Sequence, residues 1–192
     1  MITTINKPIP REYTPDFLWN NVADEYLHHF QSKLDRQQHE IRMFGKKMMQ
    51  PRLISFYADE TIKYSYSNTH FHWSWREEHI LLLKEQIKKE TWYTFNSVLC
   101  NLYRNGNDSM WRHADNEKEL WPDPIIASLS LWAERIFHLK HRQTQEKEKI
   151  LLQHGSLLLM KQWTQTQRKH AIMKTKKIVW PRINLTFRNI VG

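Results

Sequence analysis

A chain of 192 residues is about the length of one domain and can bury a single substantial hydrophobic core. Its aromatic content of 12% and hydrophobic content of 40% argue against disorder. The sequence has no apolar run near the roughly 20 residues that span a bilayer, and it begins without a signal-peptide pattern. We therefore exclude a membrane protein and expect a soluble, intracellular monomer, cytoplasmic or, in a eukaryote, nuclear.

The net charge of the chain indicates what kind of partner it binds. The net charge of +9 and the pI near 9.6 favour a polyanionic partner, because each phosphate that Lys or Arg neutralises releases counterions. Charge alone does not identify that partner, and a single basic cluster is as often a solvated surface.

The only cysteine, Cys100, cannot form an internal disulfide and lies in an apolar run, so we expect a buried thiol.

Two helices are expected in the first half of the chain. Residues 14–16 combine a capping Thr, a Pro at the first helical position and an early Asp, which is a typical helix start. The second helix should run from about Arg76 to Lys89, with a surface ion pair between Glu85 and Lys89. Core-facing residues recur at helical spacing in both: Leu18, Val22, Tyr26 and Phe30 in the first, and Ile80, Leu83 and Ile87 in the second.

Short apolar runs separated by polar turns follow the second helix and indicate strands. They occupy residues 97–103, 125–131, 136–139, 156–160 and 183–187. Helices followed by many short strands suggest an α+β fold, in which an antiparallel double sheet has helices packed against one side.

Five residues in the strand-rich half carry a recognisable chemistry: His113, Asp115, His170, Arg182 and Arg188. Two histidines and one carboxylate can occupy one face of a non-haem Fe(II) ion and leave its other positions open for a cosubstrate and dioxygen. A His-x-Asp tripeptide alone arises easily by chance, and a surface turn is the ordinary alternative. The two arginines change that balance, because a guanidinium fork suits a dicarboxylic cosubstrate bound to iron.

These residues and their surroundings resemble the AlkB-type Fe(II)/2-oxoglutarate-dependent dioxygenases, and more closely the branch that repairs nucleic acids. The matching segments lie in the family's order and cover nearly the whole second half: residues 95–106, 113–117, 125–131, 154–160, 170 and 181–188. In the first half, Phe44-Gly45, Pro51-Arg52 and residues 64–67 resemble the family's substrate-side elements. The resemblance implies one dioxygenase domain over residues 1–192, with helices and substrate-recognition elements in residues 1–94 and a double-stranded β-helix (jelly-roll) catalytic core in residues 95–192.

The same resemblance implies a site and a reaction. The metal ligands would be His113, Asp115 and His170, and 2-oxoglutarate would be bound by Asn101, Tyr103, Arg182, Asn184 and Arg188. With dioxygen, the cosubstrate would be decarboxylated to succinate while an N-linked alkyl group is hydroxylated and lost as an aldehyde. The implied partner is alkylated DNA, with RNA as a second candidate. Lys174, Lys176 and Lys177 are the best candidates to contact it, because they lie between His170 and the arginines.

A base must leave its stack to reach such a site, and aromatic walls usually clamp it. The candidates on the substrate side are Phe44, Arg52, Tyr64, Tyr66, Ser67 and Glu117. Phe44 would act as an apolar wedge that fills the vacated stack, and its alternative role is that of a buried strand residue.

The tryptophans depart from the family pattern. The chain has nine Trp and only four Gly, whereas glycine is ordinarily about 7% of residues. Five tryptophans stand where the family carries Gly or another small residue: Trp111, Trp121, Trp132, Trp163 and Trp180. Two arginines stand where the family commonly has Trp: Arg112 and Arg168. We expect strain or overfilling at some of these sites, so that Trp132→Gly raises stability and Trp111→Gly with Arg112→Trp raises activity. The alternative is a chain packed around its indoles, in which glycine would leave cavities.

Two other functions remain open at the level of sequence. One is a 2-oxoglutarate oxygenase that acts on RNA, protein or lipid. The other is a non-catalytic nucleic-acid-binding module whose pocket is blocked by the Trp replacements.

Overall fold

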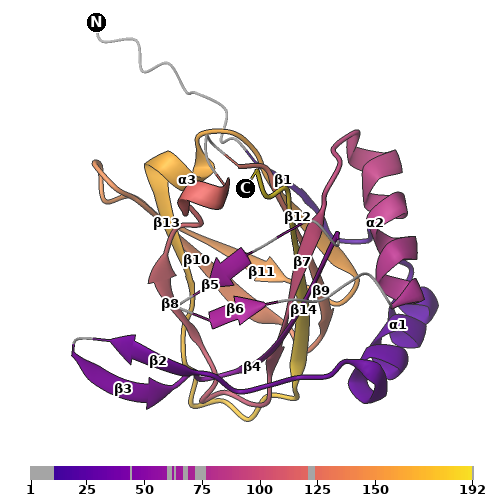
Figure 1. The fold of residues 1–192 in the computed structure, drawn as a ribbon, viewed down its shortest axis with the longest axis horizontal. Coiled ribbons are helices and arrows are strands. Elements are labelled where there is room, and N and C mark those ends of the chain that lie inside the picture. Colours follow the sequence, from indigo (N-terminus) through magenta and orange to yellow (C-terminus); the bar gives the residue numbers. More distant parts are fainter. Residues whose placement is uncertain are drawn as a thin grey trace, which may run out of the picture.

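The computed structural model describes residues 11–43, 45–59, 62, 64–66, 69–71, 77–120 and 124–191 (Figure 1). Phe44, Ser67 and Trp121, to which the sequence analysis gives roles, lie outside these described residues. Among the described helices, none has both the length and the apolar character needed to cross a bilayer.

The larger of two facing sheets has six antiparallel strands. They are β1 (Arg11–Thr14), β4 (Leu53–Ala58), β7 (Ser97–Tyr103), β9 (Ile126–Trp132), β12 (Ser156–Met160) and β14 (Arg182–Arg188). Their order in the sheet is β1-β12-β9-β14-β7-β4, so strands distant in sequence lie side by side.

The smaller sheet has four antiparallel strands. They are β8 (Met110–His113), β10 (Arg135–His141), β11 (Lys147–Leu152) and β13 (Arg168–Ile172), in the order β11-β10-β13-β8. Side chains from both sheets form one buried cluster between them: Tyr103, Ile126, Phe137, Leu139, Ile150, Leu152, Leu158, Met160 and Ile172. Two antiparallel sheets that close over a shared interior form a double-stranded β-helix, which confirms the expected fold class.

The remaining strands form two hairpins outside these sheets, and one 3-10 turn precedes β9. One hairpin joins β2 (Glu40–Met43) to β3 (Lys46–Met49), and the other joins β5 (Tyr64–Tyr66) to β6 (Thr69–Phe71); the turn is η1 (Lys118–Leu120). Figure 1 shows the β2–β3 hairpin extending away from the sheets. The expected substrate-side residues Tyr64 and Tyr66 therefore lie in strand β5.

Helices α1 (Asn20–Lys33) and α2 (Glu78–Thr91) pack on the outer face of the larger sheet, away from the smaller one (Figure 1). The short α3 (Thr164–Gln167) lies between β12 and β13. The face of α2 that the spacing predicts is fully buried, and Cys100 packs in the same cluster. Burial raises the pKa of Cys100 to about 12, so it remains a thiol.

Helix α1 begins later than expected. The predicted start at Thr14 is wrong, because residues 11–14 pair with β12 and Thr14 lies opposite Leu157. The helix begins at Asn20, and Trp19 before it makes no side-chain cap. Helix α2 begins at Glu78 rather than Arg76, with the Glu77 carboxylate as its N-cap.

The predicted surface ion pair of α2 also differs. Glu85 pairs with Lys88, three residues on, at 3.5 Å, rather than with Lys89. Spacings of three and four both bring side chains together on a helix, so the sequence alone could not separate them.

Three tryptophans occupy backbone conformations that glycine adopts without cost. Among the described residues other than glycine, φ is positive at Trp92, Trp132, Trp163 and Gln145, with values of 63°, 75°, 71° and 62°. The expectation of a glycine-like backbone is confirmed at Trp132 and Trp163. Trp111 instead lies in strand β8, and neither it nor Trp180 is among the residues with positive φ.

Trp92 is the clearest of these cases. It is the left-handed C-cap of α2, where its N–H donates to the carbonyl of Lys88, and glycine is the usual residue at such a helix end. Its side chain is 89% exposed, so the indole contributes little packing to offset the strain.

Trp92→Gly is expected to raise the free energy of unfolding by about 1 kcal/mol, because a Cβ in the left-handed region costs roughly that much. The measurement is denaturant unfolding of the full chain. Trp92→Ala is the matched control, since it removes the indole and keeps the Cβ. Equal stability of the two variants would show that the backbone conformation carries no strain. A smaller gain is expected for Trp132→Gly, because Trp132 is partly buried against the core and stacks on Trp180 at 6.3 Å.

Candidate active site

Two histidines and one aspartate meet on the interior side of the smaller sheet. His113 ends β8 and His170 lies in the neighbouring strand β13, directly opposite it in the strand pairing. Asp115 follows two residues after β8. The possible ligand atoms of these three residues all lie within 4.8 Å of one another. The structure therefore brings together the three residues that the sequence selects.

The two imidazoles are placed to bind a metal. His113 Nδ1 donates to the carbonyl oxygen of Trp111 at 2.7 Å, which directs Nε2 toward Asp115 Oδ1, 3.4 Å away. Burial, with the neighbouring His113, lowers the pKa of His170 to about 3. Metal ligands must be deprotonated, and His170 meets that condition at neutral pH.

Asp115 is buried and ionised. Burial opposes its ionisation, but the Arg188 guanidinium, 3.1 Å from Oδ1, outweighs it, so its pKa lies well below the usual range. The backbone N–H of Asp115 donates to Gln165 Oε1 at 3.0 Å, which fixes the segment after β8. A carboxylate held beside two imidazoles matches the donor set of a facial Fe(II) site.

Polar side chains from β7 and β14 line the interior face of the larger sheet next to the triad. Arg182 lies opposite Tyr103 and Asn184 opposite Asn101 in the pairing of these strands. Directly opposite residues share a face in an antiparallel pair. All five residues expected to bind the cosubstrate are buried, and four of them line one cavity together with the triad: Tyr103, Arg182, Asn184 and Arg188.

Arg182 has the properties expected of an anion-binding residue. Its Nη2 donates to Ser130 Oγ at 2.9 Å, and its guanidinium carbon lies 5.3 Å from the centre of the Tyr103 ring. Burial lowers its pKa to about 10, so it remains charged at neutral pH. Its Nε and Nη1 are buried and have no hydrogen-bond partner among the described residues. Buried donors without partners are rare, and a bound carboxylate would satisfy them.

Comparisons with known proteins agree with this geometry. Residues 11–188 match the 2OG-Fe(II) oxygenase superfamily. Human alpha-ketoglutarate-dependent dioxygenase alkB homolog 3 is 40% identical over 73% of this chain and 52% of its own length, and mouse DNA oxidative demethylase ALKBH2 is 36% identical over 79% of this chain and 67% of its own length. The chain belongs to the AlkB family of 2OG-Fe(II) dioxygenases.

The fold of this AlkB-family chain is also found in a solved structure. The structure of OsALKBH1 matches 94% of the chain with a TM-score of 0.67 at 13% sequence identity. The chain spans about half the length of the alkB homolog 3 proteins that it matches. Fe(II) and 2-oxoglutarate are the cofactors that family membership implies, and the triad supplies the matching ligands.

Two of the residues expected on the substrate side of this AlkB-family chain, Arg52 and Glu117, lie in different environments from each other. Arg52 is buried, and its Nε donates to Asn101 Oδ1 at 2.8 Å, so it lies behind an expected cosubstrate residue. Glu117 is partly buried close to the triad, and burial together with the Asp115 charge raises its pKa. Arg52 therefore lies in the interior, whereas Glu117 lies beside the metal ligands.

A second hollow borders β8 and β13 and shares Met110 and Ile172 with the cavity of the triad. It is lined by Trp111 and Arg112 from β8 and by Met173 and Lys174 after β13, together with Ser109, Met110 and Ile172. Lys174, Lys176 and Lys177 are exposed. The basic segment that the sequence singles out therefore borders a hollow next to the strands that carry the AlkB-family histidines.

Two buried residues of the site escaped the sequence reasoning. Gln165 supports Asp115 from α3, and the Nη2 of Arg135 donates to the carbonyl oxygens of Asp108 and Met173. Arg135 belongs to a strand of the AlkB-type core that alternates buried and exposed residues. That alternation was the available signal for Arg135, whereas Gln165 lies in a polar run without one.

Proposed function

We propose that this chain is an Fe(II)/2-oxoglutarate-dependent dioxygenase that removes alkyl groups from the nitrogen atoms of bases in DNA, with RNA as a second substrate. One observation carries the proposal: the buried cluster of His113, Asp115 and His170 shares a cavity with Arg182, whose guanidinium has unsatisfied donors. The similarity to ALKBH2 and alkB homolog 3 proteins supports the substrate class.

The residues divide the work in a simple way. We assign the metal to His113, Asp115 and His170, and the carboxylates of 2-oxoglutarate to Arg182 with Asn101, Tyr103, Asn184 and Arg188. When bound, iron and 2-oxoglutarate supply the oxidising chemistry that the protein itself lacks. The buried Arg182 fixes its carboxylate in one orientation, because the guanidinium cannot lose its proton at neutral pH and its fork is planar.

Arg188 links the two halves of the proposed site. Its Nη2 lies 3.1 Å from Asp115 Oδ1, and its side chain lines the same cavity as Arg182. It therefore keeps the Asp115 carboxylate ionised as well as contributing positive charge for the cosubstrate. We infer that it positions the metal ligand and the cosubstrate together.

The nucleic acid is proposed to approach over β8 and the segment after β13. Trp111 offers an aromatic face there, and Arg112 and Lys174 offer charges for phosphate. The exposed strand β3, with Lys46 and Lys47, adds positive charge on the β2–β3 hairpin, which precedes Arg52. We assign Phe44, Tyr64, Tyr66, Ser67 and Glu117 to recognition of the base, whereas the buried Arg52 orients Asn101 instead. We also propose that the protein acts as a monomer.

Succinate release by the full chain tests this function. Turnover is expected to require Fe(II) and to rise when N-methylated single-stranded DNA is added, with the unmethylated strand as control. Turnover that methylated RNA stimulates and DNA does not would move the substrate to RNA. Turnover indifferent to both would assign a protein, lipid or small-molecule substrate. DNA binding without turnover would support a binding module instead.

A further inference from the structure

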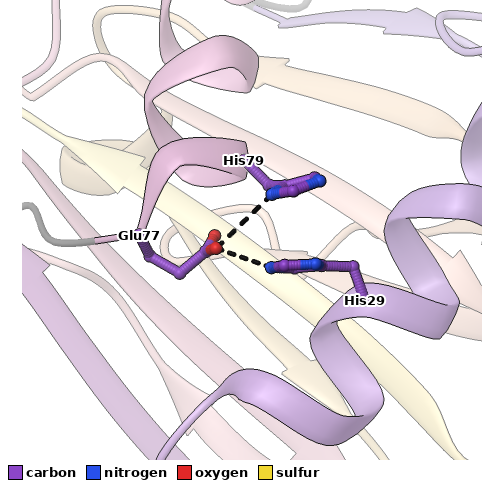
Figure 2. A group of neighbouring side chains, drawn as sticks. All are labelled: His29, Glu77 and His79. Atoms are coloured by element: carbon purple, nitrogen blue, oxygen red, sulfur yellow. Dashed lines mark hydrogen bonds and ion pairs between the residues drawn. The ribbon is translucent and has the colours of Figure 1, made fainter.

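A second group of metal-binding side chains lies on the outer face of the larger sheet. Figure 2 shows His29 from α1 beside Glu77 and His79 at the beginning of α2. Their possible ligand atoms lie within 4.8 Å of one another. Because α1 and α2 cover the side of the sheet that faces away from the interior, this cluster is separate from the proposed iron site.

The Glu77 carboxylate is already oriented. Its Oε2 accepts the backbone N–H of Ile80 at 3.1 Å, as the cap of α2. Its Oε1 lies 2.6 Å from His29 Nε2 and 3.5 Å from His79 Nδ1, so two imidazole nitrogens converge on one oxygen (Figure 2). The buried Nδ1 of His79 has no hydrogen-bond partner in the part of the chain that the structure describes.

These distances suit a small divalent cation. Zn(II) binds nitrogen and carboxylate oxygen at about 2.0–2.1 Å, usually with tetrahedral geometry, which places neighbouring ligand atoms about 3.3 Å apart. The 3.5 Å separation is close to that value, and the 2.6 Å separation needs to widen. The two rings are stacked with their centres 3.5 Å apart, so they must tilt to direct both nitrogens at one ion. The His29, Glu77 and His79 side chains are 23%, 13% and 40% exposed, which leaves the cluster open to an ion and a water ligand.

We propose that His29, Glu77 and His79 form a second divalent metal site, which takes Zn(II) and ties α1 to the beginning of α2. Two nitrogen donors and one oxygen donor satisfy the ligand preference of Zn(II), and water completes the fourth position. The ion would join residues 48 positions apart in sequence and stabilise the packing of both helices. It would take no part in the oxidation, which we place on the opposite side of the sheet.

Zn(II) titration of the untagged full chain, measured by competition with a chromophoric chelator, tests the site. Because the proposed iron site also binds Zn(II), the wild-type chain is expected to take up two equivalents. His79→Ala should take up one, His113→Ala should take up one, and the double variant should take up none with comparable affinity. His28→Ala is the matched control, since His28 is an exposed neighbour on α1 and its loss should leave two equivalents.

Thermal melting gives the second readout. In the His113→Ala background, Zn(II) should raise Tm by several degrees, as expected for a ligand that binds only the folded state. That increase should vanish when His29→Gln is added, and His29→Gln alone should leave succinate release by the Fe(II)-loaded enzyme unchanged. A single wild-type equivalent that only His113→Ala removes would overturn the proposal, and so would unchanged uptake in both His79→Ala and His29→Gln.

Discussion

Asp115→Asn is expected to lower succinate release by more than about 100-fold. Removing a residue that only hydrogen-bonds to a metal ligand costs up to about 100-fold in activity, and Asp115 is itself a proposed ligand. The substitution keeps the size of the side chain and removes the charge that lies 3.1 Å from Arg188 and faces both histidines. A neutral amide is a poor ligand beside two imidazoles, and it leaves the Arg188 guanidinium unpaired with this carboxylate. The measurement is turnover with saturating Fe(II) and 2-oxoglutarate.

The matched control is Asp24→Asn. Asp24 is an aspartate that also pairs with a histidine, His154 at 3.2 Å, but its side chain is 60% exposed on α1. Turnover of this variant should equal that of the wild type, and both variants should melt cooperatively. His113→Ala should show the same loss as Asp115→Asn. Wild-type turnover in either of these two variants would remove the triad from the mechanism.

Arg182→Leu is expected to raise the 2-oxoglutarate requirement by about 100-fold, because a hydrogen bond to a charged group contributes roughly 1.5–3 kcal/mol. Arg182 is fully buried, and two of its guanidinium nitrogens are unsatisfied among the described residues. The apparent KM for 2-oxoglutarate and for methylated DNA should be measured on the same variant. Arg182→Lys should recover part of the loss, since it keeps the charge but lacks the planar fork.

Arg112→Leu is expected to affect DNA binding rather than 2-oxoglutarate binding. Arg112 is exposed and borders the hollow outside β8, so its loss should raise the KM for DNA and leave that for 2-oxoglutarate unchanged. If Arg182→Leu instead weakens DNA binding and spares 2-oxoglutarate, Arg182 belongs to the nucleic-acid path. Arg188→Leu is less selective, because it also removes the ion pair to Asp115.

The sequence predicted the strands whose apolar residues are buried in the structure. The runs that became β7, β9, β12 and β14 are buried on both faces and carry apolar residues at most positions or at alternate positions. Strands β11 and β13 were missed, since they carry lysine or arginine among fewer apolar residues. Strand β1 was missed as well. Its extended conformation depends on pairing with β12, which follows about 140 residues later in the sequence.

The sequence by itself predicted the chemistry of this protein: two histidines and an aspartate as ligands for iron, two arginines for a dicarboxylate, and a basic surface for a polyanion. Those predictions follow from residue type and order together with the family resemblance. Only the tertiary structure decided which residues meet: Arg188 with Asp115, Gln165 with the Asp115 backbone, and His29 with Glu77 and His79. It also decided that Trp92, for which no such conformation was expected from the sequence, adopts a left-handed backbone. The physical reason is that contacts across facing sheets and helices depend on strand register and chain direction, which interactions distant in the sequence determine.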